Sequence, residues 1–331
     1  MKYRRLGKTG LSVSELCLGT MTFANQADAT ESRRILDTAV ESGVTFIDTA
    51  DAYPIGVGLD ALGRTEEIIG DWLKAKERAD LVISTKANSP TGPLPFQRGN
   101  GRQHLLHAID ESLRRLGTDY VDIYMVHFHD RHTPVDETLD ALNRIIDSGK
   151  ARYIGCSNHL AYQVARAIGR SEALGLERYR VVQPRYNLLF RQFERELFPL
   201  CEEEGIGVMT YNPLAGGLLS GKYDFSAPPP EGTRFTLGKS GSTYQDRYWD
   251  QARFEATERI GRIADEIGMA LPTLGISWVL SKPVVTSAII GASRVEQLTA
   301  TLAAADHPLD PEVVTALDAA TAEFRFGDDS R

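Results

Sequence analysis

Short apolar runs alternate with longer amphipathic segments along most of this chain. The apolar runs have the length of buried strands, and the segments between them repeat apolar residues at the three-to-four spacing of an amphipathic helix. We therefore expect eight strand–helix units. Their ranges are 16–18 with 28–42, 45–48 with 65–75, 81–85 with 102–116, 121–126 with 135–148, 153–156 with 161–173, 181–182 with 193–204, 208–211 with 252–267, and 285–290 with 294–304.

Such an alternation requires an α/β protein with a parallel sheet covered by helices. Eight evenly spaced units predict a closed (β/α)8 TIM barrel, and therefore one domain over 1–331. No Gly-x-Gly-x-x-Gly sequence follows an expected strand, as an open dinucleotide-binding sheet would require. We expect an N-terminal β-hairpin of 3–6 and 11–14 before the barrel. The long loop after the seventh strand, 212–250, is a candidate lid or ligand clamp.

Composition narrows the class of partner. The chain has 331 residues, of which 42% are hydrophobic and 25% charged, and its formal net charge is −8. These values predict a soluble globular protein without the clustered basic surface that nucleic acid binding needs. No apolar stretch is long enough for a membrane span, and the basic start lacks the apolar segment of a signal peptide. We expect a small-molecule ligand and neither a membrane nor a nucleic acid partner; monomer and homo-oligomer both stay open.

The cysteines agree with a reducing compartment. Cys17, Cys156 and Cys201 are an odd number, lie far apart in the sequence and form no Cys-x-x-Cys pair. Such a pattern is typical of reduced thiols and not of disulfides or zinc sites. We therefore expect a cytoplasmic protein.

Ionisable side chains stand at the ends of three neighbouring strands. Asp48 ends the second expected strand and Tyr53 follows in its loop, Lys86 ends the third, and His127 follows the fourth. Alone, they could be a turn cap, a loop aromatic, a strand-end lysine that reaches solvent and a core histidine. Together they favour a shared site, because α/β barrels carry their active sites at the carboxyl ends of the strands.

The charge of Lys86 connects it to two of the other side chains, Asp48 and Tyr53. A lysine that ends a buried strand is costly unless a carboxylate pairs with it, and Asp48 is the nearest candidate. A nearby ammonium favours phenolate, so we expect Lys86 to lower the pKa of Tyr53 from its usual value of about 10. Tyr53 would then be a proton donor near neutral pH, with His127 as a second donor.

These motifs resemble the catalytic tetrad of the aldo-keto reductase superfamily, and the likeness runs from Gly19-Thr20 to Gly291–Arg294. Residues 212–223 and 244–249 resemble aflatoxin-aldehyde-reductase-like and related bacterial members. The resemblance implies an NADPH-dependent enzyme that reduces an aldehyde or ketone to the alcohol. In these roles Tyr53 is the general acid, Lys86 lowers its pKa, Asp48 holds the lysine and His127 orients the carbonyl.

The resemblance also implies that NADPH/NADP+ lies across the barrel mouth. Ser157, Asn158 and Gln183 would hold its carboxamide, and its nicotinamide ring would stack on Tyr211. The cofactor contacts expected in full are Gly19, Thr20, Met21, Asp48, Ser157, Asn158, Gln183, Tyr211, Pro213, Leu214, Gly216, Leu218, Gly221, Lys222, Arg234, Gly291, Ser293, Arg294, Gln297 and Thr301. For the substrate we expect a pocket of Phe23, Tyr53, His127 and Phe128, with Met21 and residues 88–100 nearby.

Two stretches are candidates for phosphate binding. The run from Gly216 to Lys222 nearly matches a P-loop, but Tyr223 stands where Ser or Thr would bind magnesium, so nucleotide hydrolysis is excluded on that chemistry. Its glycine N–H groups and its lysine could still bind the cofactor pyrophosphate, with Arg234 as a second charge.

The second candidate is the loop after the eighth strand. Ser293 and Arg294 at an expected helix N-terminus predict an anion site, which the resemblance assigns to the 2′-phosphate of NADPH with Gln297 nearby. The alternative is a plain N-cap with a solvent-facing arginine. Thr301 stands where many members of the superfamily have Asn, which alters the expected adenine contact.

Two other functions fit parts of the sequence. His127-Phe128-His129, with His132 close by, could indicate a metal-dependent hydrolase. We expect no metal, because Lys86, Ser157 and Gln183 stand where further metal ligands would be needed. A cofactor-binding regulatory module with little turnover is the other alternative, since some relatives of this fold are channel-associated subunits.

Overall fold

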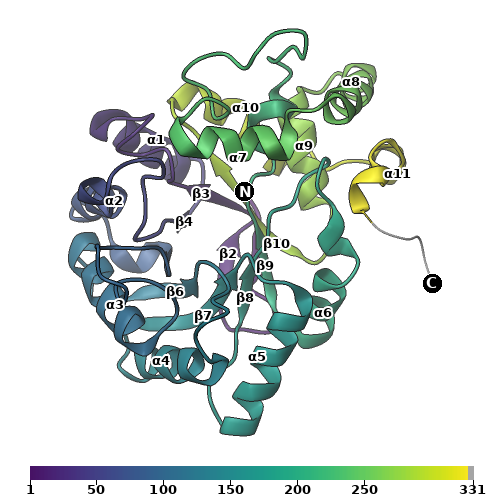
Figure 1. Ribbon diagram of the computed structural model, residues 1–331. Coiled ribbons are helices and arrows are strands. Elements are labelled where there is room, and N and C mark those ends of the chain that lie inside the picture. The colour runs from purple at the N-terminus through teal and green to yellow at the C-terminus, as the bar shows by residue number, and fades with distance from the viewer. Residues whose placement is uncertain (327–331) are drawn as a thin grey trace.

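The computed structural model describes residues 1–326, which form a closed barrel of parallel strands inside a ring of helices (Figure 1). This confirms the (β/α)8 prediction, whereas the expectation of one domain stays a prediction. In their order around the barrel, the strands are β10 (Val285–Gly291), β3 (Leu16–Gly19), β4 (Phe46–Asp48), β5 (Val82–Ala87), β6 (Val121–Val126), β7 (Ala151–Ser157), β8 (Val181–Gln183) and β9 (Gly207–Thr210). Each pairs in parallel with its neighbours.

The helices follow the amphipathic segments closely. Those expected from the sequence are α1 (Ala29–Glu41), α2 (Arg64–Leu73), α3 (Arg102–Leu116), α4 (Val135–Asp147), α5 (Ala161–Leu174), α6 (Leu197–Glu204), α8 (Gln251–Glu266) and α10 (Leu298–Leu302). The expected helix 294–304 is interrupted: a 3-10 turn, η5 (Val295–Gln297), precedes α10, and a second, η6 (Ala303–Asp306), follows it. The eighth unit therefore ends in short turns rather than in one long helix.

Three further helices were not expected from the sequence: α7 (Gly238–Tyr248), α9 (Leu271–Leu280) and α11 (Pro311–Ala320). Helix α9 is buried on every side from Thr273 to Leu280, so it lacks the polar face that makes a helix recognisable by period. No single helix of residues 1–326 is long and apolar enough to cross a membrane. Helices α8 and α9 pass that test only when combined across a bend of 94°.

The apolar residues form two layers. The larger layer fills the space between the strands and the surrounding helices, and the smaller one fills the barrel interior. Leu6 and Val13, from the hairpin of β1 (Tyr3–Arg5) and β2 (Ser12–Ser14), belong to the inner layer. The Lys8 N–H donates to the carbonyl of Gly205 just before β9, at a distance of 2.8 Å. The hairpin therefore closes the amino-terminal end of the barrel.

The barrel interior changes from apolar to polar along four of its strands, β4, β6, β8 and β9. Side chains of a strand alternate between its two faces, so the residue two positions after an inward apolar residue also points inward. Two positions after an apolar residue of the inner layer, a polar residue therefore also points inward: Asp48 after Phe46, His127 after Met125, Gln183 after Val181 and Tyr211 after Met209. The same period of two that builds the core therefore places polar groups at the open end.

Close packing of α2 against α3 gives a test of the ring. A Cβ on Gly70 would lie 2.1 Å from the carbonyl oxygen of Arg115, whereas a Cβ on Gly169 in α5 meets nothing within 4 Å. We expect Gly70→Ala to lower the free energy of unfolding by about 1–3 kcal/mol or more. Gly169→Ala is the matched control and should raise it by about 0.5–1 kcal/mol. Urea unfolding followed by circular dichroism measures both changes, and equal effects would contradict the packing argument.

Candidate functional site

The carboxyl end of the barrel is built around the buried ammonium of Lys86. Its Nζ lies 2.7 Å from Oδ2 of Asp48 and 2.7 Å from the carbonyl oxygen of Thr49. The lysine is fully buried and Asp48 is only 3% exposed. The pairing of these two side chains, which we expected from the cost of an isolated buried charge, is present.

The Asp48 carboxylate is held by more than the lysine. Its Oδ1 accepts hydrogen bonds from Ser84 Oγ at 2.6 Å and from Gln183 Nε2 at 2.9 Å. Three donors from two other strands therefore fix one carboxylate, and hydrogen bonds to a charged group are the stronger kind. This geometry offsets the desolvation of the ion pair and fixes the direction of the Lys86 side chain.

The loop after β4 returns Tyr53 to this ion pair. Thr49 N–H donates to the carbonyl of Ser84 and Asp51 N–H to that of Lys86, so the chain first continues alongside β5. Tyr53 N–H then donates to the carbonyl of Ala50 and closes a turn. The ring of Tyr53 comes to rest with its centroid 5.3 Å from the Lys86 Nζ. The four-residue spacer seen in the sequence therefore brings the phenol over the lysine.

The expected effect of Lys86 on the Tyr53 phenol is not found. Burial raises the pKa of Tyr53 well above its ordinary value, and the negative charge of Asp48 raises it further. The prediction of a lowered pKa was wrong because burial, the larger effect, and the charge of Asp48 both disfavour the phenolate, and Asp48 also neutralises the Lys86 ammonium at 2.7 Å. In this structure Tyr53 is a neutral phenol with its proton in place.

His127 is the second neutral donor of the site. Its ring meets that of Tyr53 edge-on, with centroids 5.9 Å apart, and stacks on Phe128 at 4.7 Å. Burial, followed by the positive charge of Lys86, holds the pKa of His127 well below its usual range. Its Nδ1 has no hydrogen-bond partner among residues 1–326. A neutral imidazole in this position can donate one hydrogen bond to a ligand.

A group of amides and hydroxyls lines the opposite side of the barrel mouth. Tyr211 donates its hydroxyl to Asn158 Oδ1 at 2.8 Å, and Asn158 Nδ2 donates to the His127 carbonyl and to Ser157 Oγ. The Ser157 hydroxyl donates to the carbonyl of Gln183 at 2.9 Å. The three amide-binding residues expected from the sequence, and the aromatic residue expected beside them, are therefore connected by hydrogen bonds.

A cavity of about 1430 Å³ opens from the barrel mouth to the outer edge of the ring. It exceeds the size of a typical site for one small molecule, so it has room for an extended ligand together with a second one. The lining includes these expected residues: Gly19, Thr20, Met21, Asp48, Tyr53, His127, Phe128, Ser157, Asn158, Gln183, Tyr211, Pro213, Leu214, Gly216, Lys222, Arg234, Gly291, Ser293, Arg294, Gln297 and Thr301.

Several expected residues lie elsewhere. Phe23 is fully buried in the layer between barrel and helices and does not contact the cavity. Leu218 is buried in the same layer, and neither Gly221 nor any of residues 88–100 lines the cavity. Apolar side chains at such positions gain more by packing than by facing a polar mouth. Of the two phenylalanines expected in the substrate pocket, only Phe128 lines the cavity, with 44% of its surface exposed.

Helix α7 is the main part of the cavity wall that the sequence did not reveal. It contributes Ser240, Thr243, Tyr244 and Arg247, and it lies on the side of the ring where α9 and α10 stand (Figure 1). We expected the long loop 212–250 to cover a ligand, but we expected no helix within it. The segment that forms α7 is short and rich in Gly and Ser, so it has no recognisable helical pattern. Only the run of aromatic and cationic residues at 244–249 was singled out in the sequence, as part of the family resemblance, and it was not assigned to particular contacts.

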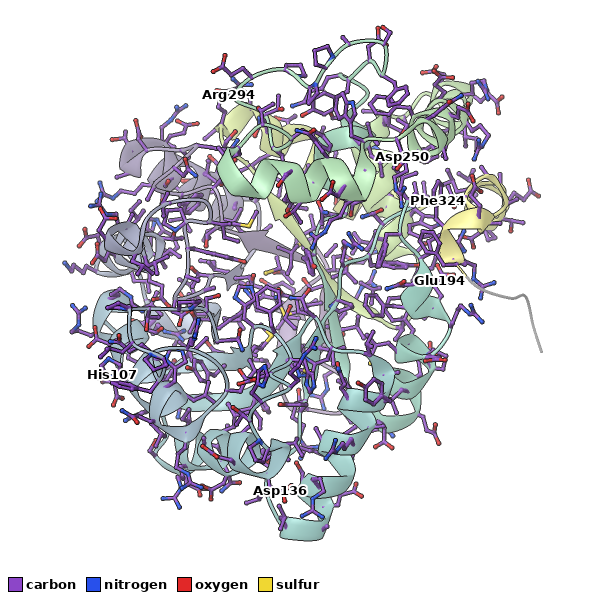
Figure 2. All side chains as sticks on the ribbon, viewed as in Figure 1. His107, Asp136, Glu194, Asp250, Arg294 and Phe324 are labelled. Carbon is purple, nitrogen blue, oxygen red and sulfur yellow. The ribbon has the colours of Figure 1, made fainter. Side chains whose placement is uncertain are left out.

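Lys222, Arg234 and Arg294 line the outer part of the cavity, and Arg247 of α7 lines it as well. None of them forms an ion pair with a carboxylate of the described chain. Burial and then the charge of Arg294 lower the pKa of Lys222, so these two cations repel each other. Arg294 lies near the edge of the ring, away from the central strands (Figure 2). Unpaired cations on one concave wall favour an anionic ligand.

The glycine N–H groups are less available for a phosphate than we expected. Gly216 donates to Oδ1 of Asn212, Gly217 to the carbonyl of Leu214 and Gly221 to that of Leu218. The bonds of Gly217 and Gly221 close the 3-10 turns of η4 (Ala215–Ser220), and that of Gly216 goes to a side chain, so the expectation of free amides was wrong for these glycines. At this loop the N–H groups of the three glycines are already bonded, whereas the positive charge of Lys222 is free to meet an anion.

The loop after β10 also differs from its expected form. The N–H and the hydroxyl of Ser293 both point at Oε1 of Gln297, and the N–H of Val295 donates to Oε1 of Glu31 at 2.8 Å. The turn that follows has three residues, so the expected dipole of a long helix is missing. Neither the helix-terminus site nor the plain N-cap describes this loop, in which side chains occupy the donors.

Asp51, which had no role in the sequence interpretation, is 1% exposed, and its carboxyl oxygens have no hydrogen-bond partner among residues 1–326. Burial, followed by the charge of Glu66, raises the pKa of Asp51 well above its ordinary value. Glu66 itself accepts from Thr85 Oγ1 at 2.6 Å and from Arg115 Nε at 2.7 Å. The raised pKa favours the protonated, neutral form of the Asp51 carboxyl group.

The histidines after β6 do not gather. His129 faces His159, with ring centroids 5.3 Å apart, while the N–H of His132 donates to Asp130. Within residues 1–326 no group of three or more His, Cys, Asp or Glu side chains could hold a metal ion. His159 instead donates its Nδ1–H to the carbonyl of Ser157 at 2.8 Å and supports the amide group.

Comparison with known proteins gives consistent similarities. The profile of the Aldo/keto reductase family matches residues 15–322. The chain is 39% identical to "Probable voltage-gated potassium channel subunit beta" of Arabidopsis thaliana, over 92% of each sequence. It is 36% identical to "Uncharacterized oxidoreductase YrpG" of Bacillus subtilis, over 96% of this chain and 95% of that protein. With "L-glyceraldehyde 3-phosphate reductase" of Escherichia coli it shares 34% identity over 90% and 86%.

Protonation of His159 gives a test of the burial of this region. Burial lowers the pKa of His159 to about 4. A buried neutral histidine stabilises the fold fully above its unfolded pKa of about 6.5, and this contribution is lost as the pH falls towards 4. The loss amounts to about 2 kcal/mol by pH 5. We expect His159→Gln to make the free energy of unfolding fall less between pH 7.5 and pH 5.

Urea unfolding at the two pH values measures this difference. The exposed His132 supplies the matched control, since His132→Gln should keep the pH dependence of the original chain. The buried His104 and His127 keep part of that dependence in every variant. An unchanged pH dependence in His159→Gln would show that His159 titrates alike in the folded and unfolded chain.

Proposed function

Because this chain belongs to the aldo/keto reductase family, we propose that it is an NADPH-dependent oxidoreductase that reduces an aldehyde or ketone to the alcohol. The family match and the oxidoreductase relatives support an oxidoreductase. The observation that carries the finer proposal is the phenol of Tyr53, which stands over the Lys86–Asp48 pair in the wall of a cavity lined by unpaired cations.

Tyr53 is the proposed proton donor. When bound, NADPH would supply the hydride that reaches the carbonyl carbon. The high pKa of Tyr53 keeps the phenol protonated near neutral pH, so it can give its proton to the oxygen as negative charge develops there. The Lys86 ammonium then stabilises the phenolate, and Asp48 holds that ammonium in place.

His127 is the proposed orienting donor. Because its imidazole is neutral, it can donate a hydrogen bond to the carbonyl oxygen without bringing a second positive charge beside Lys86. Phe128 stacks on the imidazole and presents an exposed apolar face to the cavity. A carbonyl compound with an apolar side suits this arrangement.

The rest of the cavity suits the dinucleotide. We assign the carboxamide to Ser157, Asn158 and Gln183 and the face of the nicotinamide ring to Tyr211. Lys222 and Arg234 would meet the pyrophosphate, Ser293, Arg294 and Gln297 the 2′-phosphate, and Thr301 the adenosine end. Lys222, Arg234, Arg247 and Arg294, which have no carboxylate partner among residues 1–326, support a ligand that carries several negative charges.

A cofactor-binding module with little turnover is the second candidate function. It is favoured by the similarity to the protein named as a probable potassium channel subunit. Both candidates require dinucleotide binding, and they differ in whether Tyr53 transfers a proton.

Replacement of the phenol tests the reductase. We expect Tyr53→Phe to lower kcat by about 10²–10⁴-fold, the usual contribution of a general acid, while the Kd for NADPH changes by less than about threefold. NADPH absorbance with an aldehyde panel that includes 4-nitrobenzaldehyde and succinic semialdehyde measures turnover. Quenching of protein fluorescence measures binding.

Tyr162, an exposed phenol on α5, supplies the control Tyr162→Phe, which should keep both values. Loss of NADPH oxidation in Tyr53→Phe alone supports the reductase. Equal background rates in the original chain and in Tyr53→Phe across the panel, with NADPH bound by both, would instead support the binding module.

Replacement of Arg294 tests the 2′-phosphate assignment. A hydrogen bond from a charged donor to a phosphate contributes about 1.5–3 kcal/mol, so we expect Arg294→Ala to weaken NADPH binding by about tenfold or more. NADH lacks that phosphate, and its Kd should change by less than about threefold. Equal weakening of the two cofactors would contradict the assignment, and Arg33→Ala on the exposed face of α1 is the control.

A further inference from the structure

We propose that Glu31 sets the balance between NADPH and NADH by holding a negative charge against the loop that receives the 2′-phosphate. This inference rests on the proposed function, because it requires that a dinucleotide occupies the cavity. Glu31 lies in the first turn of α1, far in sequence from the loop after β10, and it was not among the residues singled out in the sequence.

The carboxylate of Glu31 joins two parts of the chain. Its Oε1 accepts the N–H of Val295 at 2.8 Å, between the cavity-lining residues Arg294 and Glu296. Its Oε2 lies 2.6 Å from Nη1 of Arg34, one turn further along α1. The side chain of Glu31 is 20% exposed and that of Arg34 is 59% exposed, so the carboxylate is the more enclosed partner.

The acceptors at this loop differ in charge. Gln297 satisfies the N–H and the hydroxyl of Ser293 with a neutral amide oxygen, which a phosphate can replace without repulsion. Glu31 satisfies Val295 with a full negative charge. Glu296 also lines the cavity, but it is exposed to solvent, where its charge is screened.

The charge of Glu31 opposes the one feature that distinguishes the two cofactors. Arg294 attracts the 2′-phosphate of NADPH, whereas a carboxylate one residue away along the backbone repels it. NADH presents a neutral hydroxyl at this position and is nearly indifferent to both charges. Arg34 compensates part of the repulsion, so Glu31 and Arg34 act on the preference in opposite directions.

Substitution of Glu31 by an amide isolates the charge. Glu31→Gln keeps an oxygen that can accept the Val295 N–H, and it removes the negative charge. We expect the Kd for NADPH to fall relative to the Kd for NADH by ~3–10-fold, a range that allows for the partial exposure of the pair. Fluorescence titration with each cofactor at low and at physiological salt measures the ratio, and the effect should shrink at higher salt.

Substitution of Arg34 supplies the opposite sign. Arg34→Gln leaves the Glu31 carboxylate without its partner and should raise the Kd of NADPH relative to that of NADH. The neighbouring Arg33, which faces Asp71 at 3.7 Å, gives the matched control Arg33→Gln with an unchanged ratio. A merely structural role of Glu31 would weaken both cofactors together and leave the ratio as it was.

The outcomes separate the two proposals. If the original chain binds neither NADPH nor NADH, the proposed function fails. If it binds them and Glu31→Gln leaves their ratio unchanged, or moves it towards NADH, the role of Glu31 is overturned while the proposed function stands. A shift towards NADPH in Glu31→Gln together with a shift towards NADH in Arg34→Gln supports the inference.

Discussion

The buried ammonium of Lys86 is the constraint on which the rest of the site depends. A charge without solvent costs several kcal/mol even after relaxation, so the chain must supply acceptors in fixed positions. Asp48 and the carbonyl of Thr49 do so, and Asp48 in turn needs Ser84 and Gln183. These partners come from strands β4, β5 and β8, which meet at one mouth only because the barrel closes. The buried ion pair therefore has all its hydrogen-bond partners only when the barrel is closed.

The protonation of the site follows from the same burial. Burial raises the pKa of Tyr53 and lowers that of His127, so both groups beside the ion pair are neutral. The sequence, in which Lys86 was already paired with Asp48, suggested a lowered pKa for the phenol because the cost of burying a phenolate was not weighed. In the structure, burial and the charge of Asp48 outweigh the stabilisation that the Lys86 ammonium gives to a phenolate, so the pKa of Tyr53 is raised and not lowered. Under the proposed function, the Lys86–Asp48 pair would act on the negative charge that develops on Tyr53 as it gives up its proton.

The sequence predicts the barrel and the residues at its strand ends because both obey short-range rules. The apolar run that identifies β4 as a buried strand ends at Asp48, and the alternation of side chains along a strand aims Asp48 into the mouth; the same alternation places His127 and Tyr211. Helix α9 obeys no such rule, since it is apolar all round, and α7 is held by contacts that no local pattern encodes. Phe23 failed for a related reason: its position in a loop after a strand was correct, but which way a loop side chain turns depends on the packing of distant helices.

Charge is distributed unevenly along the cavity, and this decides how it can bind a ligand. The inner end has a neutralised ion pair and two neutral donors, while the outer end has Lys222 and Arg294 in mutual repulsion. At the outer loop, Gln297 and Glu31 already accept from the backbone, so an arriving phosphate exchanges hydrogen bonds instead of adding them. Exchanged hydrogen bonds contribute little net free energy. Affinity at that end must therefore come from charge, which is why we propose that one carboxylate on α1 matters as much as the serine and the glutamine that we assign to the phosphate.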